Sequence, residues 1–202
     1  MRLAAPAVLM ACLLSGCSTT DKGSPVPTDD IATTTLPRTR TAEPTGPDQG
    51  TPQVSNPLDV SAFAADPCTS ITKAQAGALG VAHPGVGEPA VGGKACLWRN
   101  ESGGSVLLSV VTANGLDGVY GAKARGELAV FEELPPVEGF PAVVANKVDL
   151  RDTGDCTVWV GTSDEEMVGV ALGQSRDKVG DKDPCLVAAS VASQVITTMK
   201  AG

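Results

Sequence analysis

The amino-acid sequence predicts an α+β domain, in which a mostly antiparallel β-sheet is flanked by helices and two disulfides stabilise the fold. Three observations support this prediction. Segments with strand-like alternation follow one another across short polar turns, as they do in hairpins. Helix signals lie at both ends of the folded region, a capping box at the start and apolar periodicity at the end. The same region holds four cysteines, an even number that forms two bridges in an oxidising compartment.

A capping box predicts the first helix. Thr72 stands three residues before Gln75, the spacing at which the two side chains cap each other's backbone N–H groups. Gly80 is placed to end this helix, because glycine readily adopts the left-handed conformation of a helix C-terminus. Residues 95–100 and 106–112 then flank a Ser-Gly-Gly turn, so we expect them to form a hairpin.

The second half of the chain predicts one more helix and three strands. Apolar side chains recur three and four residues apart over residues 116–130, which indicates an amphipathic helix. A short strand is expected at residues 142–146, and longer ones at 156–162 and 166–172. Alternation of large and small apolar side chains is clearest in the last of these.

The final helix has a well-defined beginning. Asp183 stands at the N-cap position and Pro184 at the first helical position, where its missing N–H has no cost. Apolar residues then repeat at helical spacing, namely Val187, Val191, Val195 and Met199. The predicted order α-β-β-α-β-β-β-α, with strands in hairpins, is typical of a mostly antiparallel sheet covered by helices.

The N-terminus predicts a lipoprotein signal peptide. Residues 3–14 form an apolar segment behind the basic Arg2, and this segment is shorter than the roughly 20 residues of a membrane-spanning helix. The tetrapeptide Leu-Ser-Gly-Cys closes the segment at Cys17 and is similar to the lipobox of bacterial lipoproteins. We therefore expect removal of residues 1–16 and acylation of Cys17, for example with palmitate. The alternative is an ordinary secretory signal with a coincidental cysteine.

A tether is expected to follow the lipidated cysteine. Residues 18–57 contain ten Thr and seven Pro without apolar periodicity. Such a composition buries too little apolar surface to fold. We predict that residues 17–57 form a disordered tether, glycosylated or unmodified, and that residues 58–202 form an extracytoplasmic domain. The lipid on Cys17 would hold the protein at the outer face of the cell membrane.

The chain contains six cysteines, of which Cys12 leaves with the signal and Cys17 takes the lipid. The remaining four are Cys68, Cys96, Cys156 and Cys185, and the sequence alone does not choose among their three pairings. Placement favours Cys68 with Cys96 and Cys156 with Cys185, because each pair would tie a helix N-terminus to a strand. A four-thiolate zinc site is the alternative, but the spacings lack a Cys-x-x-Cys knuckle.

Charge and aromatic content argue against nucleic acid as a partner. Residues 58–202 carry eleven basic and eighteen acidic side chains, so phosphate backbones would be repelled. Phe, Trp and Tyr together make up 3% of the chain, which leaves few rings on which bases or sugars could stack. Membrane contact is therefore expected through the lipid alone.

Sequence motifs for catalysis are scarce. The single histidine, His83, lies in the Gly/Pro-rich loop 81–94, and no Gly-x-Ser-x-Gly elbow exists. Residues 87–94 superficially resemble a phosphate-binding loop, but the spacing is one residue too long and Ala95 replaces the magnesium-binding Ser or Thr. We predict that the protein is not an enzyme and needs no cofactor.

Acidic residues gather in three places that do not follow the calcium-loop pattern. These are Asp149, Asp152 and Asp155; residues 164–166; and Asp177, Asp181 and Asp183. Charged solvated turns are the simplest interpretation, and no metal site is predicted. Paired carboxylates for glycoside hydrolysis remain open in principle.

Two tryptophans and one loop are candidates for ligand contact. Trp98 and Trp159 lie on the strands that carry cysteines, so they either pack against the disulfides or line a cleft. The loop 81–94 would be fixed by the first disulfide, and a loop fixed to a scaffold commonly carries recognition. The sequence does not identify ligand-binding residues beyond these candidates.

The cysteine contexts resemble those of a known family. Asp-Pro-Cys ends at Cys68, Ala-Cys-Leu-Trp surrounds Cys96, Cys-Thr-Val-Trp-Val begins at Cys156, and Asp-Pro-Cys recurs at Cys185. Together with the lipobox and the tether, these segments are similar to the actinobacterial lipoprotein family called domain of unknown function 3558. The resemblance implies a secreted, lipid-anchored envelope protein with two disulfides, and it transfers no activity. In element order the domain also resembles Mog1-type, PsbP-type and mycobacterial kinase-sensor folds.

The expected function is non-enzymatic binding of an unidentified partner or ligand in the cell envelope. One alternative is a carrier that holds an apolar or lipid ligand between sheet and helices. Another is an accessory enzyme of cell-wall metabolism, which would need a cleft with convergent polar groups. The identity of the partner, an envelope protein or an apolar ligand, is left open.

Overall fold

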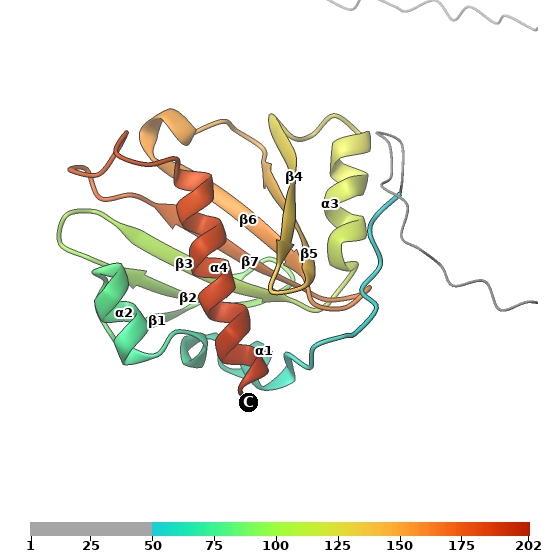
Figure 1. The fold of residues 1–202 in the computed structure, drawn as a ribbon, viewed down its shortest axis with the longest axis horizontal. Helices are drawn as coiled ribbons and strands as arrows, with labels where there is room; N and C mark the ends of the chain where they lie inside the picture. Colours follow the sequence, from blue (N-terminus) through green and yellow to red (C-terminus); the bar gives the residue numbers. More distant parts are fainter. Residues whose placement is uncertain (1–49) are drawn as a thin grey trace, which may run out of the picture. The chain divides into compact units, whose positions relative to one another are not determined.

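The computed structural model describes residues 50–202, and Figure 1 shows their fold. Within these residues, seven strands form one sheet in the order β1-β2-β3-β7-β6-β5-β4, and every neighbouring pair is antiparallel. Helices flank the sheet, so the predicted α+β class is confirmed. The strands are β1 (Val86–Ala90), β2 (Gly93–Arg99), β3 (Ser105–Val111), β4 (Val130–Val137), β5 (Phe140–Asn146), β6 (Asp155–Gly161) and β7 (Met167–Gly173). The helices are α1 (Ser61–Ala65), α2 (Lys73–Leu79), α3 (Gly115–Ala124) and α4 (Pro184–Lys200), with 3₁₀ turns η1 (Pro67–Ser70) and η2 (Arg151–Thr153).

The sheet consists of two meanders that meet in its middle. Strands β1, β2 and β3 follow one another as hairpins, and so do β4, β5, β6 and β7. The meanders join where β3 pairs with β7, over the full length of both strands. This arrangement puts β1 and β4 at the two edges of the sheet.

Helix α4 lies diagonally across one face of the sheet (Figure 1). Its buried side chains, Ala188, Val191, Ala192, Val195, Ile196 and Met199, pack against the inward-facing residues of the strands. The predicted apolar stripe of this helix is therefore confirmed, apart from Val187, which is only half-buried. The first helical segments, including α2, lie along the same face and complete the main core.

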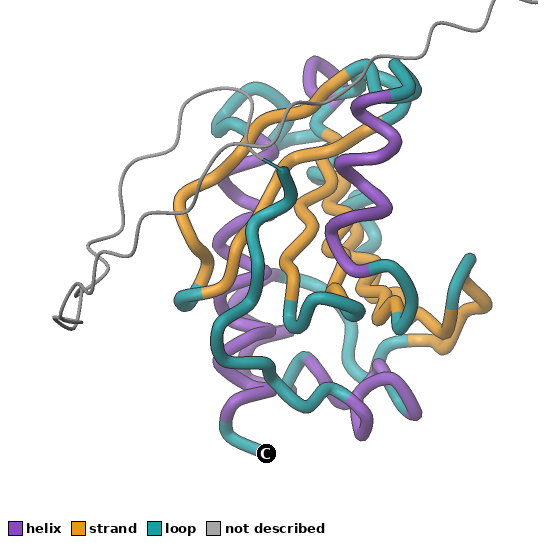
Figure 2. The backbone as a smooth tube through the Cα atoms, turned by 90° about the vertical axis from the view of Figure 1, so that its right-hand side faces the viewer, coloured by secondary structure: helices purple, strands orange, loops and turns teal. Residues whose placement is uncertain are grey.

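The opposite face of the sheet is covered only in part among the described residues. Helix α3 packs there on β5 and on neighbouring strands, through a second cluster that includes Leu116, Val119, Val143, Ala145 and Met167. Figure 2 shows α3 and α4 on opposite sides of the strands. Toward β1 and β2, outward-facing side chains such as Leu97 and Leu107 are half-buried.

Helix ends follow the capping signals of the sequence. The Thr72 hydroxyl accepts from the Gln75 backbone N–H, the Gln75 side chain accepts from the Thr72 N–H, and Gly80 ends α2 with φ +68°. Asp183 caps α4 by accepting from the backbone N–H groups of Cys185 and Leu186. These caps satisfy backbone donors that have no partner inside the helix.

One helix end and two strands differ from the prediction. The helix expected over residues 116–130 ends at Ala124, because Gly126 adopts φ +69° and the chain then enters β4 at Val130. The loop expected at 81–94 contains β1. Both unpredicted strands are edge strands that contain proline, Pro89 in β1 and a Pro-Pro pair in β4, which a sheet edge tolerates because one side makes no ladder bonds.

The packed region begins upstream of the boundary predicted at Leu58. Val54 is buried, and its backbone N–H donates to Asp164 Oδ1 at 2.9 Å. The short helix α1, which the sequence did not predict, follows and buries Phe63. A few residues assigned to the tether thus belong to the domain, because contacts more than a hundred residues away in sequence hold them.

Among residues 50–202, no helix is both long enough and apolar enough to cross a bilayer.

Candidate functional site

A cleft of about 430 Å³ opens where one end of the sheet meets α2 and α4. We call this end of the molecule the loop end; it comprises the β2–β3 turn (100–104), the β5–β6 loop (147–154), the β7–α4 loop (174–183) and the first turn of α4. The loop-end cleft lies between α2, the β2–β3 turn, the β7–α4 loop and the start of α4. In Figure 1 the β7–α4 loop projects on the left, whereas residues 50–57, coloured cyan, run along the right.

One wall of the loop-end cleft is apolar. Leu79 contributes from the end of α2 and Val81 from the loop that follows, Val106 and Leu172 from the ends of β3 and β7, and Val187 from α4. These side chains lie at the border of the main core, so helix packing holds them in place. An apolar group of a ligand would therefore contact a wall that already exists.

Asn100 holds three walls of the cleft together. Its Nδ2 donates to the Gly80 carbonyl at 3.1 Å and to Ser175 Oγ at 2.9 Å. Its Oδ1 accepts from the Gly104 backbone N–H at 2.7 Å. One half-buried side chain thus joins the end of α2, the β2–β3 turn and the β7–α4 loop.

Gly104 allows this close approach. A Cβ at Gly104 would lie 2.5 Å from Ser175 Oγ and 2.8 Å from Asn100 Nδ2. Real Cβ atoms essentially never come so near to other heavy atoms. The glycine of the predicted turn therefore brings the turn and the β7–α4 loop into contact.

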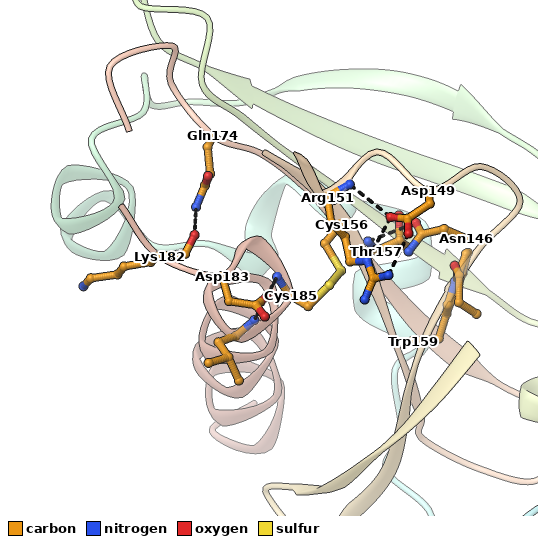
Figure 3. Close-up of a disulfide and its surroundings, with 12 residues drawn as sticks. Asn146, Asp149, Arg151, Cys156, Thr157, Trp159, Gln174, Lys182, Asp183 and Cys185 are labelled. Atoms are coloured by element: carbon orange, nitrogen blue, oxygen red, sulfur yellow. Dashed lines mark hydrogen bonds and ion pairs between the residues drawn. A yellow bond between two sulfur atoms is a disulfide. The ribbon is translucent and has the colours of Figure 1, made fainter. Parts of the chain in front are cut away.

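The other wall is charged. Lys178 and Asp181 line the cleft and form an exposed ion pair with an N–O distance of 3.6 Å. Lys182 also lines it and forms no ion pair within residues 50–202. Beneath these residues, Gln174 Nε2 donates to the Lys182 carbonyl at 2.9 Å, as Figure 3 shows. Gln174 Oε1 is buried without a hydrogen-bond partner in the described part of the chain.

The Cys156–Cys185 disulfide fixes the start of α4 to β6 beside this wall. The two Cα atoms are 5.1 Å apart, within the usual range for a disulfide. Figure 3 places the bridge next to Asp183, the N-cap of α4. Because the β7–α4 loop ends at this bridge, its C-terminal end is fixed to the sheet.

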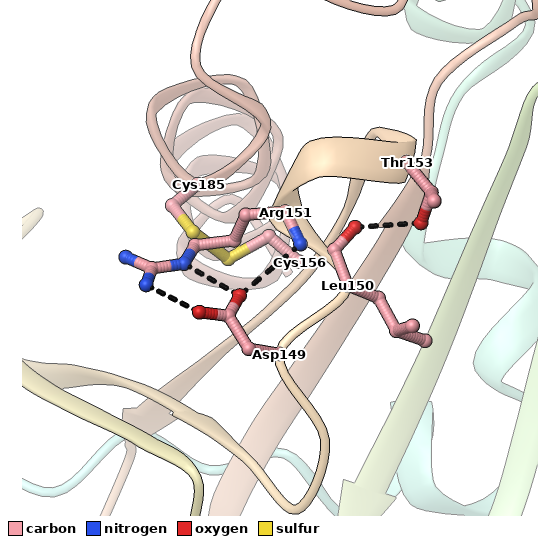
Figure 4. A network of polar contacts seen from close by, with 6 residues as sticks. All are labelled: Asp149, Leu150, Arg151, Thr153, Cys156 and Cys185. Carbon is pink, nitrogen blue, oxygen red and sulfur yellow. Dashed lines mark hydrogen bonds and ion pairs between the residues drawn. A yellow bond between two sulfur atoms is a disulfide. The ribbon is translucent and has the colours of Figure 1, made fainter.

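A second polar group lies on the other side of the same disulfide (Figure 4). Arg151 Nε donates to Asp149 Oδ1 at 2.8 Å, and an Arg151 terminal nitrogen donates to Asp149 Oδ2 at 2.6 Å. These hydrogen bonds lower the pKa of the Asp149 carboxyl to about 2. Both side chains are exposed, so the pair orders the β5–β6 loop rather than forming a reactive centre.

The Cys68–Cys96 disulfide has the same Cα separation of 5.1 Å and ties η1 to β2. The pairing favoured from the sequence is therefore present for both bridges. Gly85 lies against this bridge, because a Cβ there would be 2.6 Å from both Cys96 Sγ and the Trp98 ring. The loop that precedes β1 is thus packed on the disulfide.

The tryptophans have different surroundings. Trp98 is buried in the main core on the same face of β2 as Cys96, in agreement with packing near the disulfide. The same interpretation is wrong for Trp159. Its side chain points to the opposite face from Cys156, packs under α3, and donates from Nε1 to the Ala145 carbonyl at 3.3 Å. Alternation along β6 separates the two residues.

Other candidates lie apart from the loop-end cleft. His83 is exposed in the loop before β1, and of that loop only Val81 lines the cleft. Within residues 50–202, no group of three or more His, Cys, Asp or Glu side chains is arranged to hold a metal ion. Cys17 lies outside the described residues.

Sequence reasoning missed Asn100, Lys178 and Lys182. An Asn directly before a Ser-Gly-Gly turn is a signal for a turn-closing side chain, since Asn amides commonly bond to backbone groups of the same turn. The bonds from Asn100 to Gly80 and Ser175 have no such local signal, because those residues are 20 and 75 positions away.

Comparison with known families shows where the chain belongs. Residues 12–198 match the family described as "Protein of unknown function (DUF3558)". No curated protein and no solved structure matches the chain. The matched region covers most of the chain and contains Cys17 together with all four disulfide cysteines. The chain therefore belongs to the DUF3558 family of proteins of unknown function.

Proposed function

We propose that this protein is a lipid-anchored binding protein of the cell envelope that holds a partner or ligand in the loop-end cleft without catalysing a reaction. The observation that carries the proposal is the cleft itself. It combines an apolar wall with hydrogen-bonding and charged groups, and the Cys156–Cys185 disulfide fixes the start of α4 beside it. Ligand sites commonly have volumes of roughly 300–1,000 Å³ and this mixture of groups.

Exposed apolar side chains at the loop end support contact with a partner. Val148, Leu150, Val179 and Leu186 are all exposed there, the last by 68%. None of these four lines the cleft itself, and exposed apolar side chains are common on interaction surfaces. The partner would therefore contact other parts of the loop end as well as the cleft.

The space between the sheet and α4 is filled by side chains. Val158, Val170 and Ile196 are fully buried between them, and the surrounding core residues are similarly packed. An apolar ligand held there would have to displace these residues, which costs several kcal/mol for side chains of this size. The open cleft is the better place for such a ligand.

The lining groups favour binding over catalysis. Ser175 Oγ accepts a hydrogen bond from the Asn100 amide, and an amide does not act as a general base for a serine nucleophile. The remaining polar lining includes two lysines and one aspartate near the surface. These groups offer charge and hydrogen bonds to a ligand, which is the role that we propose.

Site-specific crosslinking on living cells tests this proposal. A photo-crosslinking amino acid replaces Ala78, an exposed residue of α2 that lines the cleft. Ala74 is a matched control, because it is exposed on the same helix but does not line the cleft. We expect a defined adduct from position 78 that is absent from position 74. Equal labelling at both positions, or turnover of a cell-wall substrate lost on a single substitution, would contradict the proposal.

The lipid anchor has its own test. Metabolic labelling with an alkyne fatty acid should mark the full chain, and Cys17→Ser should abolish the label and release the protein from the membrane fraction. Cys12→Ser is the control, because it leaves the proposed acylation site intact. Unchanged labelling of Cys17→Ser would show that Cys17 is not the acylated residue.

A further inference from the structure

We infer that the loop-end cleft takes an apolar chain that ends in a carboxylate. This inference rests on the proposed binding function and names the chemical class of the ligand. A fatty acid and the free C-terminus of an apolar peptide share this chemistry. Three features of the lining favour such a ligand: the apolar wall, the charge of the opposite wall, and the hydrogen-bonding state of Ser175.

The apolar wall favours contact with the hydrocarbon chain of a ligand rather than with a polar group. Leu79, Val81 and Val187 are half-buried, so each presents apolar surface toward the cleft. Behind them Val106 and Leu172 close the floor. Each methylene that such a wall removes from water contributes roughly 0.8 kcal/mol.

The opposite wall has a surplus of positive charge. Two lysines and one aspartate line the cleft, although residues 58–202 as a whole contain more acidic than basic residues. Asp181 offsets Lys178, with which it pairs at 3.6 Å. Lys182 remains as the cation without an ion-pair partner in the described part of the chain. A single negative charge therefore matches this wall better than a multiply charged group.

Lys182 is well placed to meet that charge. Its carbonyl is held by Gln174, which fixes the backbone while the side chain extends from the loop (Figure 3). Lys182 lines the same cleft as Ala78 and Leu79 of α2. The ammonium group can therefore pair with a carboxylate whose chain lies along the apolar wall.

Ser175 supplies a second donor. Its Oγ accepts from Asn100 Nδ2 at 2.9 Å, and none of the hydrogen bonds among the described residues uses its hydroxyl proton. Because Asn100 fixes the position of this oxygen, the proton can point toward an acceptor in the cleft. A carboxylate has two oxygens, one for the Ser175 hydroxyl and one for Lys182. A neutral alcohol would lose the charge-assisted contact.

The test compares octanoate with 1-octanol, which share a chain of the same length and differ in charge. Both are titrated into residues 17–202 carrying Cys17→Ser, with NMR shifts of Leu79, Val81 and Val187 as the readout. We expect octanoate to bind about tenfold more tightly, since a contact to a charged group is lost with the alcohol. Added salt should weaken octanoate binding and leave octanol unchanged.

Variants identify the cation. Lys182→Gln should remove most of the difference between octanoate and octanol, with octanol affinity unchanged. Lys178→Gln is the matched control and should have the smaller effect, because Asp181 already offsets this charge. Both lysines are exposed, so neither variant is expected to disturb folding.

A capped apolar tripeptide with a free or an amidated C-terminus distinguishes the source of the carboxylate. If the free acid binds more tightly than the amide, and Lys182→Gln removes this difference, the result supports a peptide terminus. If only octanoate binds more tightly than its neutral partner 1-octanol, and Lys182→Gln removes that difference, the result supports a fatty acid. Equal binding of acids and their neutral partners would overturn the inference, while the crosslink at position 78 would still support the binding function. If neither acid shifts the cleft residues, the inference also fails, and the crosslink separately decides the proposed function.

Discussion

Trp159 lies across Gly169 on the neighbouring strand, and the two residues are direct partners in the β6–β7 register. A Cβ at Gly169 would be 2.5 Å from the Trp159 ring and 2.8 Å from Ser109 Oγ on β3. The glycine therefore provides the space that the indole occupies beneath α3. This contact links the middle of the sheet to the smaller core under that helix.

Gly169→Ala should lower the free energy of unfolding by about 2 kcal/mol, because the added methyl group forces the indole out of place. Denaturant unfolding under non-reducing conditions measures this change. Gly87→Ala is the control, since nothing lies within 4 Å of a Cβ at that exposed position. Equal stability of the two variants would mean that Trp159 moves aside at no cost.

Asn100→Ala should destabilise the protein by about 1–3 kcal/mol, since the buried Gly104 N–H and the Gly80 carbonyl lose a partner. It should also reduce the crosslink at position 78, because the α2 end and the β7–α4 loop lose their shared clamp. Asn56→Ala is the control at an exposed position and should change stability by less than about 0.5 kcal/mol. A full crosslink yield in Asn100→Ala would show that the clamp is not needed for binding.

Removal of either disulfide should lower the free energy of unfolding by nearly the same amount. The bridges span sequence separations of 28 and 29 residues, so each constrains the unfolded chain by about 3.6 kcal/mol in the loop-entropy relation. Paired Cys→Ala variants, Cys68 with Cys96 and Cys156 with Cys185, are compared by denaturant unfolding. A large difference between the two variants would show that strain or packing, rather than chain entropy, dominates one bridge.

The Asp149–Arg151 pair should respond to acid in a defined window. Its hydrogen bonds lower the pKa of Asp149 from the ordinary 3.8 to about 2. A lowered pKa in the folded state means that the stabilisation is complete above pH 3.8 and is lost as the pH falls through about 2. A carboxyl ¹³C titration should find the low midpoint in the parent protein, and Arg151→Gln should move it toward 3.8. A midpoint near 3.8 in the parent would show that the pair is not formed in solution.

Local chemistry made much of the fold predictable. The caps at Thr72 and Asp183 involve side chains within three residues of the groups that they satisfy. The predicted bounds of β2, β3, β6 and β7 differ from the observed ones by only a residue or two, and β3 alternates in burial over its whole length. The favoured cysteine pairs are also present: Cys156–Cys185 joins two elements that the sequence identified, whereas Cys68 lies in η1, which the sequence did not predict.

The edge strands were missed for a physical reason. β1 has an almost wholly exposed burial pattern and contains Pro89, so it lacks the alternation that indicates a strand. β4 contains two prolines and a register shift between Leu134 and Val137. Both β1 and β4 form because each pairs with a neighbouring strand on one side. Such pairing depends on the tertiary structure and cannot be predicted from the segment alone.

The class of the fold, the ends of α2 and α4, and the even set of cysteines were predictable, since each depends on composition or on residues close together in the chain. The pairing of β3 with β7, and the contacts of Asn100 with Gly80 and Ser175, were not predictable, because they join residues far apart in the chain. The cleft depends on those contacts, because α2, the strand ends and the β7–α4 loop are far apart in sequence and meet only once the sheet is assembled. For this reason the site, and the ligand class proposed for it, follow from the folded protein and not from any one segment.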